Sequence, residues 1–188
     1  KKKPPPFSVK WISDVLLRDG ALSGLNPEAR GVLLTLIETG ARLSEICNLK
    51  PENIVVDGEH PHIRIEPSDD PDDPREIKTM SSIRVVPLVG VSLAAMRKHR
   101  RGFPRYRDKG SGLSATINKF LRENNLLETP DHKVYSLRHS FEDRMKDAGL
   151  DTELRMMLMG HSIDRPDYGE GGSLKWKHDE LLKIALPF

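Results

Sequence analysis

Apolar residues recur at helical spacing along most of the chain. After Asn26, a residue type that caps helices, and Pro27, apolar positions line one face as far as Gly40. This pattern predicts a helix that starts at residue 27 and ends at Gly40, with Arg42 just beyond its end. The same criteria predict further helices at about residues 44–49, 92–100, 112–124, 136–148, 152–159 and 174–185, with Gly149 and Gly160 as the stops of two of them.

Between residues 54 and 88 the spacing changes to that of β-strands. The residues from Ile54 to Val56 are followed by an Asp57-Gly58 turn and by the alternating segment from His62 to Ile65. After a segment rich in aspartate, further strand pattern appears at about 76–78 and 83–88. We therefore predict a small three-stranded antiparallel sheet beside a helical body, a mainly α fold of the α+β class.

The length of 188 residues suits a single domain with a sizeable core. We expect residues 1–25 to form a lead-in, which opens with KKKPPP, and a first helix. Residues 26–188 then form the domain, with a tail helix at about 173–186. The chain has no run of ~20 apolar residues and no signal-peptide pattern, which predicts a soluble protein of the cytoplasm. The single cysteine, Cys47, excludes an internal disulfide and is interpreted as a core residue.

Charge is distributed unevenly along the chain. The net charge is +2, from 30 Lys and Arg against 28 Asp and Glu. Residues 66–76 alone carry −5, which leaves +7 on the remainder and favours a DNA-facing body with double-stranded DNA as partner. The densest basic run is either a DNA contact or a solvated helix face, and it contains Arg97, Lys98, Arg100 and Arg101.

Four separated segments hold residue types suited to phosphate chemistry: TGARLSEICNL (39–49), IKTMSSIRVVPL (77–88), YSLRHSF (135–141) and LMGHSIDRPDY (158–168). In this order and at these separations they resemble the motif set of the tyrosine recombinases of the phage integrase kind, over roughly residues 26–170. The resemblance implies a catalytic domain that cleaves and rejoins DNA through a 3′-phosphotyrosyl bond. It also implies assembly as a tetramer on DNA, in which the C-terminal helix can join subunits, and no need of a metal or another cofactor.

The resemblance implies that Arg42 and Arg138 hold the reacting phosphate. A planar guanidinium can bind two oxygens of one phosphate, which a lysine cannot do. Arg138 falls on the first turn of a predicted helix, where the helix dipole also favours an anion. The alternative for Arg42 is a surface ion pair with Glu45 or Glu38.

By the same resemblance, His161 donates to a non-bridging phosphate oxygen and His139 supports the site from behind. Lys78 matches the hairpin lysine that protonates the leaving 5′ oxygen, and its alternative is an ordinary exposed strand lysine. Tyr168 is the candidate nucleophile, seven residues after His161 where about nine is more common. The other tyrosines are Tyr106 and Tyr135.

Tyr135 stands where the family usually has a histidine. A tyrosine hydroxyl can donate a hydrogen bond to phosphate but does not exchange a proton near neutral pH. The alternative interpretation is a core aromatic residue at a helix start. This departure and the short spacing from His161 to Tyr168 leave open a DNA-binding module that has lost catalysis. The chemistry that the resemblance implies also leaves open a type IB topoisomerase-like relaxation of DNA.

Two histidines, His60 and His62, precede the aspartate-rich segment with Asp69, Asp70, Asp72 and Asp73. Alternate strand positions would place both imidazoles on one face, as a metal site requires. The Asp-Pro repeats nevertheless read as a solvated insertion between strands, so we predict no metal site there.

Overall fold

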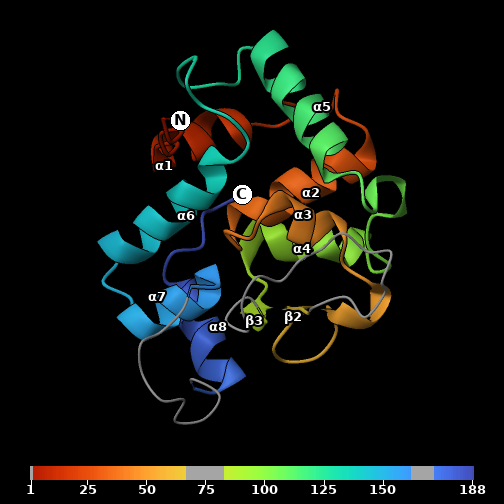
Figure 1. Cartoon of the computed structure of the whole chain (residues 1–188). Coiled ribbons are helices and arrows are strands. Elements are labelled where there is room, and N and C mark those ends of the chain that lie inside the picture. Colours follow the sequence, from red (N-terminus) through yellow and green to blue (C-terminus); the bar gives the residue numbers. More distant parts are fainter. Residues whose placement is uncertain (1, 67–82, 162–171) are drawn as a thin grey trace.

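A computed structural model of the chain describes residues 2–66, 83–161 and 172–188, in which a small sheet lies at one side of a helical body (Figure 1). The α-helices are α1 (Val9–Trp11), α2 (Pro27–Ile37), α3 (Leu43–Cys47), α4 (Gly90–Lys98), α5 (Gly110–Glu123), α6 (Ser136–Asp147), α7 (Thr152–Met159) and α8 (Leu174–Leu182). A π-helix, η1 (Ile12–Leu16), and two 3₁₀-helices, η2 (Pro51–Asn53) and η4 (Pro104–Tyr106), complete the helical elements. The strands are β1 (Ile54–Val55), β2 (His62–Ile65) and β3 (Arg84–Pro87).

The sheet has the order β1-β2-β3, and both pairs of neighbours are antiparallel. Ile63 at its centre lies opposite Ile54 on one side and Val86 on the other. The predicted three-stranded antiparallel sheet and the mainly α fold class are therefore confirmed. The strand expected at 76–78 lies outside the described residues.

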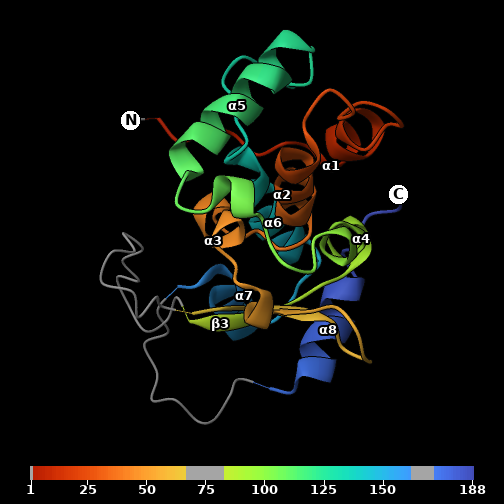
Figure 2. The same ribbon diagram turned by 90° about the vertical axis from the view of Figure 1, so that its right-hand side faces the viewer.

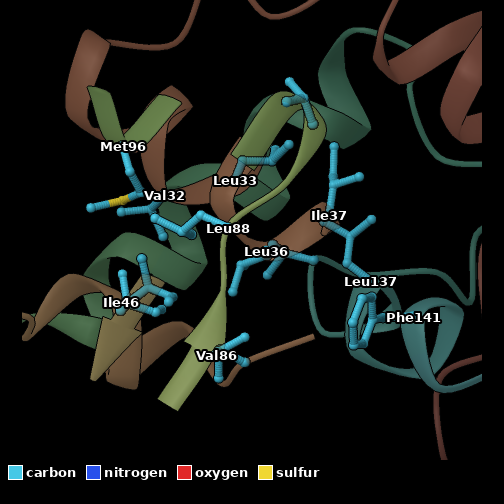
Figure 3. Close-up of a cluster of buried hydrophobic side chains, with 14 of the residues drawn as sticks. Val32, Leu33, Leu36, Ile37, Ile46, Val86, Leu88, Met96, Leu137 and Phe141 are labelled. Atoms are coloured by element: carbon cyan, nitrogen blue, oxygen red, sulfur yellow. The ribbon is translucent and has the colours of Figure 1, made fainter. Parts of the chain in front are cut away.

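Helix α2 is the centre of the hydrophobic core. Asn26 Oδ1 accepts a hydrogen bond from the Ala29 backbone N–H at 3.0 Å, and Pro27 occupies the first turn, so this helix starts where the sequence predicts. Helices α3, α4, α5 and α6 all contact it. Figure 3 shows its apolar face among side chains from α3, β3, α4 and α6: Val32, Leu33, Leu36, Ile37, Ile46, Val86, Leu88, Met96, Leu137 and Phe141.

Helix α4 starts at Gly90, two residues before the predicted start. Ser92 is a good capping residue by type, yet it is fully buried. Its Oγ accepts from the Glu38 backbone N–H at 3.0 Å and lies 2.8 Å from the Thr35 carbonyl oxygen. Ser92 therefore joins α4 to α2 and does not cap a helix. Helix α5 likewise starts two residues early, at Gly110, and α8 ends early, at Leu182.

The segment before Asn26 packs into the same core as the rest of the chain. Phe7, Ile12 and Leu16 are buried, and Trp11 Nε1 donates to the Leu126 carbonyl oxygen at 2.9 Å. Cys47 is also buried, as predicted. Within the described ranges, no helix has the length and apolar character needed to cross a membrane.

Candidate active site

Arg138, on the first turn of α6, joins three parts of the chain. Its side chain is buried, and Nη1 donates to the Gly40 carbonyl oxygen at 2.8 Å while Nη2 donates to the Met159 carbonyl oxygen at 2.7 Å. The turn after α2, the start of α6 and the end of α7 therefore meet at one guanidinium. A guanidinium carries five N–H donors, so three remain for an oxyanion.

Arg42 precedes the first residue of α3, two residues after the carbonyl that Arg138 holds. Its backbone N–H donates to Glu45 Oε1 at 2.8 Å, which fixes the start of the helix. The Arg42 side chain is 41% exposed, and its Nη1 lies 3.8 Å from Glu45 Oε2. The expected alternative of a pair with Glu45 is thus present only as a loose contact. The alternative of a pair with Glu38 is wrong, because Glu38 pairs with Arg144.

His161 follows Gly160, which ends α7 in the left-handed conformation at φ +72°. The His161 backbone N–H donates to the Met156 carbonyl oxygen at 2.8 Å, and its side chain is exposed. Since Arg138 holds the neighbouring Met159 carbonyl, the same guanidinium fixes both the turn before Arg42 and the turn before His161.

The charges of these residues act on one another. Burial lowers the pKa of Arg138, and the nearby positive charge of Arg42 lowers it further. Burial also lowers the pKa of His161, with the charges of Arg138 and Arg42 acting in the same direction. A neutral His161 still donates one N–H, and a cluster of cations in partly buried surroundings favours a bound anion.

Tyr135 precedes α6 on the same side of the site as Arg138. Its side chain is 46% exposed, so the interpretation as a core aromatic residue is wrong. Tyr135 and Arg138 both line a pocket whose apolar wall includes Leu36, Ala41 and Val134. The Tyr135 hydroxyl is therefore available to a ligand at Arg138.

His139 lies behind this surface, with its ring edge-on to Tyr135 at 5.2 Å between centroids. Its Nε2 is buried and has no hydrogen-bond partner in the part of the chain that the structure describes. Burial lowers the pKa of His139, and the charge of Lys3 adds to this effect. His139 is thus placed to support Tyr135 and is less accessible to a ligand than Tyr135.

Three candidates for proton transfer or nucleophilic attack remain. Two of them, Lys78 and Tyr168, lie outside the described residues, and the third is Tyr106. Tyr106 is buried, and its hydroxyl accepts from Asn26 Nδ2 at 2.7 Å, which engages it in the packing of α2 against η4. Tyr106 is therefore unavailable as a nucleophile.

The basic run at the end of α4 does not join the cluster around Arg138. Arg97, Lys98, Arg100 and Arg101 are exposed, and Arg100 pairs with Asp57 of the β1–β2 turn at 2.7 Å. Figure 2 shows α3 and α4 on opposite sides of α2. The basic run therefore lies away from Arg42 and Arg138.

The two histidines of the β1–β2 hairpin do not converge on one another. His62 Nδ1 lies 2.8 Å from the His60 carbonyl oxygen, and the His60 ring instead contacts that of His178 in α8. Within residues 2–66, 83–161 and 172–188, no three His, Cys, Asp or Glu side chains gather as a metal site. The four aspartates considered with these histidines lie outside the described residues.

The C-terminal segment docks on its own chain. Helix α8 contacts β3, and Leu181 is fully buried. Beyond the helix, Arg144 Nη2 donates to the Ile184 carbonyl oxygen at 2.8 Å, and the Leu186 backbone N–H donates to Glu38 Oε2 at 2.9 Å. Backbone groups therefore make the polar contacts that hold the tail.

Sequence reasoning missed Glu45 and Arg84 as parts of the site. Glu45 entered only as a surface partner of Arg42, and Arg84 only as part of a strand motif. In the structure, Arg84 and Glu45 form a buried ion pair directly beneath Arg42. The spacing of Arg42 and Glu45, three residues apart, could have signalled the helix start, because an acidic residue at that position often caps one.

Comparison with known proteins places this arrangement in a family. The sequence profile of the Phage integrase family matches residues 21–165. A search among curated proteins finds no match to the sequence. The integrase from mycobacterium phage Brujita has a TM-score of 0.67 at 16% identity, over 98% of this chain and 59% of that protein.

Two further solved structures give the same picture. The XerA recombinase has a TM-score of 0.64 at 16% identity, over 96% of this chain and 59% of that one. The XerH site-specific recombinase bound to palindromic difH substrate has a TM-score of 0.59 at 15% identity, over 97% of this chain and 51% of that one. The chain thus spans between half and two thirds of the length of these proteins. Since the profile covers most of the chain and the folds agree, the protein belongs to the phage integrase family and has the fold of the tyrosine recombinases.

Proposed function

We propose that this chain is a site-specific DNA recombinase that cleaves and rejoins strands through a 3′-phosphotyrosyl intermediate. One observation carries the proposal: Arg138 donates to carbonyls on both sides of it, so that Arg42 and His161 are held around a single guanidinium. This arrangement presents donors from α3, α6 and the turn after α7 to one anion. A phosphodiester is the anion that such a cluster suits, because planar guanidinium groups bind two of its oxygens at once.

In the proposed reaction, the Tyr168 hydroxyl gives its proton to solvent water, its oxygen attacks phosphorus, and the bond from phosphorus to the 5′ oxygen breaks. The 3′ phosphate remains bonded to Tyr168, and the leaving 5′ oxygen takes a proton from Lys78. A 5′ hydroxyl from a partner strand then returns a proton to Lys78 and attacks the phosphotyrosine, which releases Tyr168 to take up a proton from water. The phosphotyrosine bond conserves the energy of the broken phosphodiester, so the exchange requires no ATP.

Stabilisation of the pentacoordinate phosphorus falls to Arg42, Arg138 and His161. Fixed donors at developing negative charge commonly contribute on the order of 10²- to 10³-fold in rate each. Tyr135 adds a hydroxyl donor from the edge of the pocket. In this proposal the Tyr135 hydroxyl donates a hydrogen bond to phosphate and takes no part in proton transfer.

The proposed partner is double-stranded DNA, on which the protein assembles as a tetramer in the cytoplasm. In the tetramer the C-terminal segment would exchange the contacts with its own chain for contacts with a neighbouring subunit. Arg97, Lys98, Arg100 and Arg101 would contact DNA away from the reacting phosphate. Such contacts strengthen binding in a salt-dependent way and carry no sequence information by themselves.

The decisive experiment uses a nicked suicide duplex that carries the protein's own recombination site, from which the cleaved fragment diffuses away. The wild-type chain should form a covalent protein–DNA adduct that survives denaturing electrophoresis, and Tyr168→Phe should form none. Tyr106→Phe is the matched control, because Tyr106 is engaged in packing and its loss should leave the adduct. Absence of a wild-type adduct, or an adduct with Tyr168→Phe, contradicts the proposed chemistry.

A further inference from the structure

Arg84, the first residue of β3, has one of the most completely buried charged side chains in the described part of the chain. Its side chain is 1% exposed. Nη1 donates to Glu45 Oε2 at 2.8 Å and Nη2 to Glu45 Oε1 at 2.9 Å, while Nε donates to the Leu158 carbonyl oxygen at 2.8 Å. Three donors of one guanidinium therefore connect β3 to α3 and to the end of α7.

Glu45 contacts two arginines, Arg84 and Arg42, through different groups. Both of its oxygens accept from the Arg84 side chain, and Oε1 also accepts from the Arg42 backbone N–H at 2.8 Å. The Arg42 guanidinium, in contrast, is 3.8 Å from Oε2. Glu45 thus fixes the backbone at Arg42, while the hydrogen-bond donors of the Arg42 guanidinium remain largely available.

The end of α7 is held by two arginines side by side. Arg84 takes the Leu158 carbonyl and Arg138 takes the Met159 carbonyl. Gly160 follows immediately, and a Cβ at this position would lie 2.8 Å from Arg84 Nη1. Arg84 therefore packs against the turn that presents His161, and its position depends on the absence of a side chain at residue 160.

We infer that Arg84 is a positioning residue, which keeps the Glu45 carboxylate away from the Arg42 guanidinium and holds the turn before His161. The inference rests on the proposed role of Arg42 as a phosphate ligand. Without Arg84, the nearest cation to Glu45 among the described residues is Arg42, only 3.8 Å away. Glu45 then pairs with Arg42, occupies the donors meant for phosphate and neutralises their charge.

The test is a pair of variants, Arg84→Met and Arg84→Met combined with Glu45→Gln. Methionine fills similar space without charge, so the single variant releases the Glu45 carboxylate. Adduct formation on the nicked duplex should fall about 10²-fold, the usual loss for one phosphate donor. The double variant has no carboxylate to capture Arg42 and should regain at least about tenfold of that rate. Arg84→Lys, which keeps a charge but cannot bind both oxygens, should fall between wild type and Arg84→Met.

A purely structural role predicts a different pattern. Rates would then follow thermal stability, and the double variant would recover activity only as far as its melting temperature recovers. Melting curves and far-ultraviolet circular dichroism of all variants separate the two outcomes. A double variant as stable as wild type but no faster than Arg84→Met overturns the inference.

A second measurement does not depend on catalysis. Phenylglyoxal modifies accessible arginine side chains, and peptide mass spectrometry reports the rate at Arg42 alone. In Arg84→Met the rate at Arg42 should fall by about two- to fivefold, as expected when a partly exposed ion pair forms, and the double variant should restore it. An unchanged or faster rate in Arg84→Met overturns the inference. If the wild type forms no DNA adduct, the proposed function fails, while the modification rates still decide the role of Arg84.

Discussion

Two buried arginine–glutamate pairs lie in different parts of the molecule, one beneath the candidate site and one beneath the C-terminal tail. Arg84 and Glu45 form the site pair, and Arg144 and Glu38 form the tail pair. Both arginines also donate to backbone carbonyls, Arg84 to Leu158 and Arg144 to Ile37 and Ile184. Each pair therefore joins chain segments that are far apart in the sequence.

The pKa values of the two carboxylates are shifted in opposite directions, although burial acts to raise both. Burial acts to raise the pKa of Glu45, but the hydrogen bonds and charge of Arg84 outweigh it, and the pKa is lowered. For Glu38, burial raises the pKa, and the opposing charge and hydrogen bond of Arg144 do not compensate for it. Glu45 receives both arms of its arginine, whereas Glu38 receives one nitrogen of Arg144 and the Leu186 backbone N–H.

This difference indicates what each pair does. The site pair is a favourable ion pair that holds the Glu45 carboxylate on Arg84 and leaves the Arg42 guanidinium 3.8 Å from it. In the tail pair, burial disfavours the charged form of Glu38. The tail itself is held through its backbone groups, which any segment of similar shape could supply. We therefore expect the site pair to control activity and the tail pair to control stability.

The strongest way to break this comparison is Arg144→Met. This substitution leaves Glu38 buried without its counter-charge and removes the donor to the Ile37 and Ile184 carbonyls. Loss of one partner of a buried pair typically costs about 3–5 kcal/mol of unfolding free energy. Urea denaturation followed by circular dichroism measures this loss. Arg105→Met, an exposed arginine on η4, is the control and should change stability little.

Adding Glu38→Gln to Arg144→Met should recover part of the stability, because no buried charge then remains unpaired. A loss below about 1 kcal/mol in the single variant would place the tail pair among ordinary surface contacts and remove the basis of the comparison.

A smaller effect is expected from Gly160→Ala, which acts on the site pair. Gly160 has φ +72°, and a Cβ there would lie 2.8 Å from Arg84 Nη1 and 3.1 Å from Arg84 Cζ. The left-handed conformation alone costs a residue with a side chain about 1–2 kcal/mol. The matched control is Gly149→Ala, because Gly149 has φ +70° but nothing within 4 Å of a Cβ. Both variants should lose this conformational contribution in urea denaturation, and Gly160→Ala should lose more, because its Cβ also displaces Arg84.

Only Gly160→Ala should also slow adduct formation on the nicked duplex, by roughly tenfold, since it alone displaces Arg84 from the turn before His161. Equal rates for the two glycine variants would show that the packing of Arg84 against this turn does not matter for activity.

The sequence predicted those features that local patterns determine. The cap at Asn26, the order of the helices, the Asp57-Gly58 hairpin and the stop at Gly160 all follow from neighbouring residues, and the structure agrees with them. The start of α4 was predicted two residues late, because the helix begins at Gly90 and the hydroxyl of Ser92, inside it, is engaged with α2. That contact depends on packing that no local pattern contains.

The candidate site likewise contains residues that local motifs predict and residues that depend on tertiary packing. Arg42, Arg138 and His161 could be identified because their motifs are local, although their roles remain proposals. The Arg84–Glu45 pair joins residues that are 39 positions apart and could not be deduced from spacing. The pair forms only because the fold brings β3 close to α3 and α7. The sequence does not show whether an arginine is buried or exposed.

The smallest expected effect is also the most specific, and it uses pH to separate the two carboxylates. Glu45 has a lowered pKa when folded, so its contribution to stability is complete above the unfolded pKa of about 4.3 and is lost as pH falls through the lower folded value. Glu38 has a raised pKa when folded, so the folded state takes up a proton first. The free energy of unfolding of the wild type, relative to a variant with a neutral side chain at position 38, therefore increases as pH falls through the folded pKa of Glu38 towards about 4.3.

The measurement compares the wild type with Glu45→Gln and with Glu38→Gln by urea denaturation at several pH values between neutral and about 3.5, a range that spans the ordinary glutamate pKa. The advantage of wild type over Glu45→Gln should shrink towards acid pH, whereas wild type should gain on Glu38→Gln over the same change. Glu123→Gln, an exposed residue at the end of α5, corrects for general charge effects. If both differences change in the same direction, the two pairs have the same electrostatic balance, and the assignment of one to activity and the other to stability loses its physical basis.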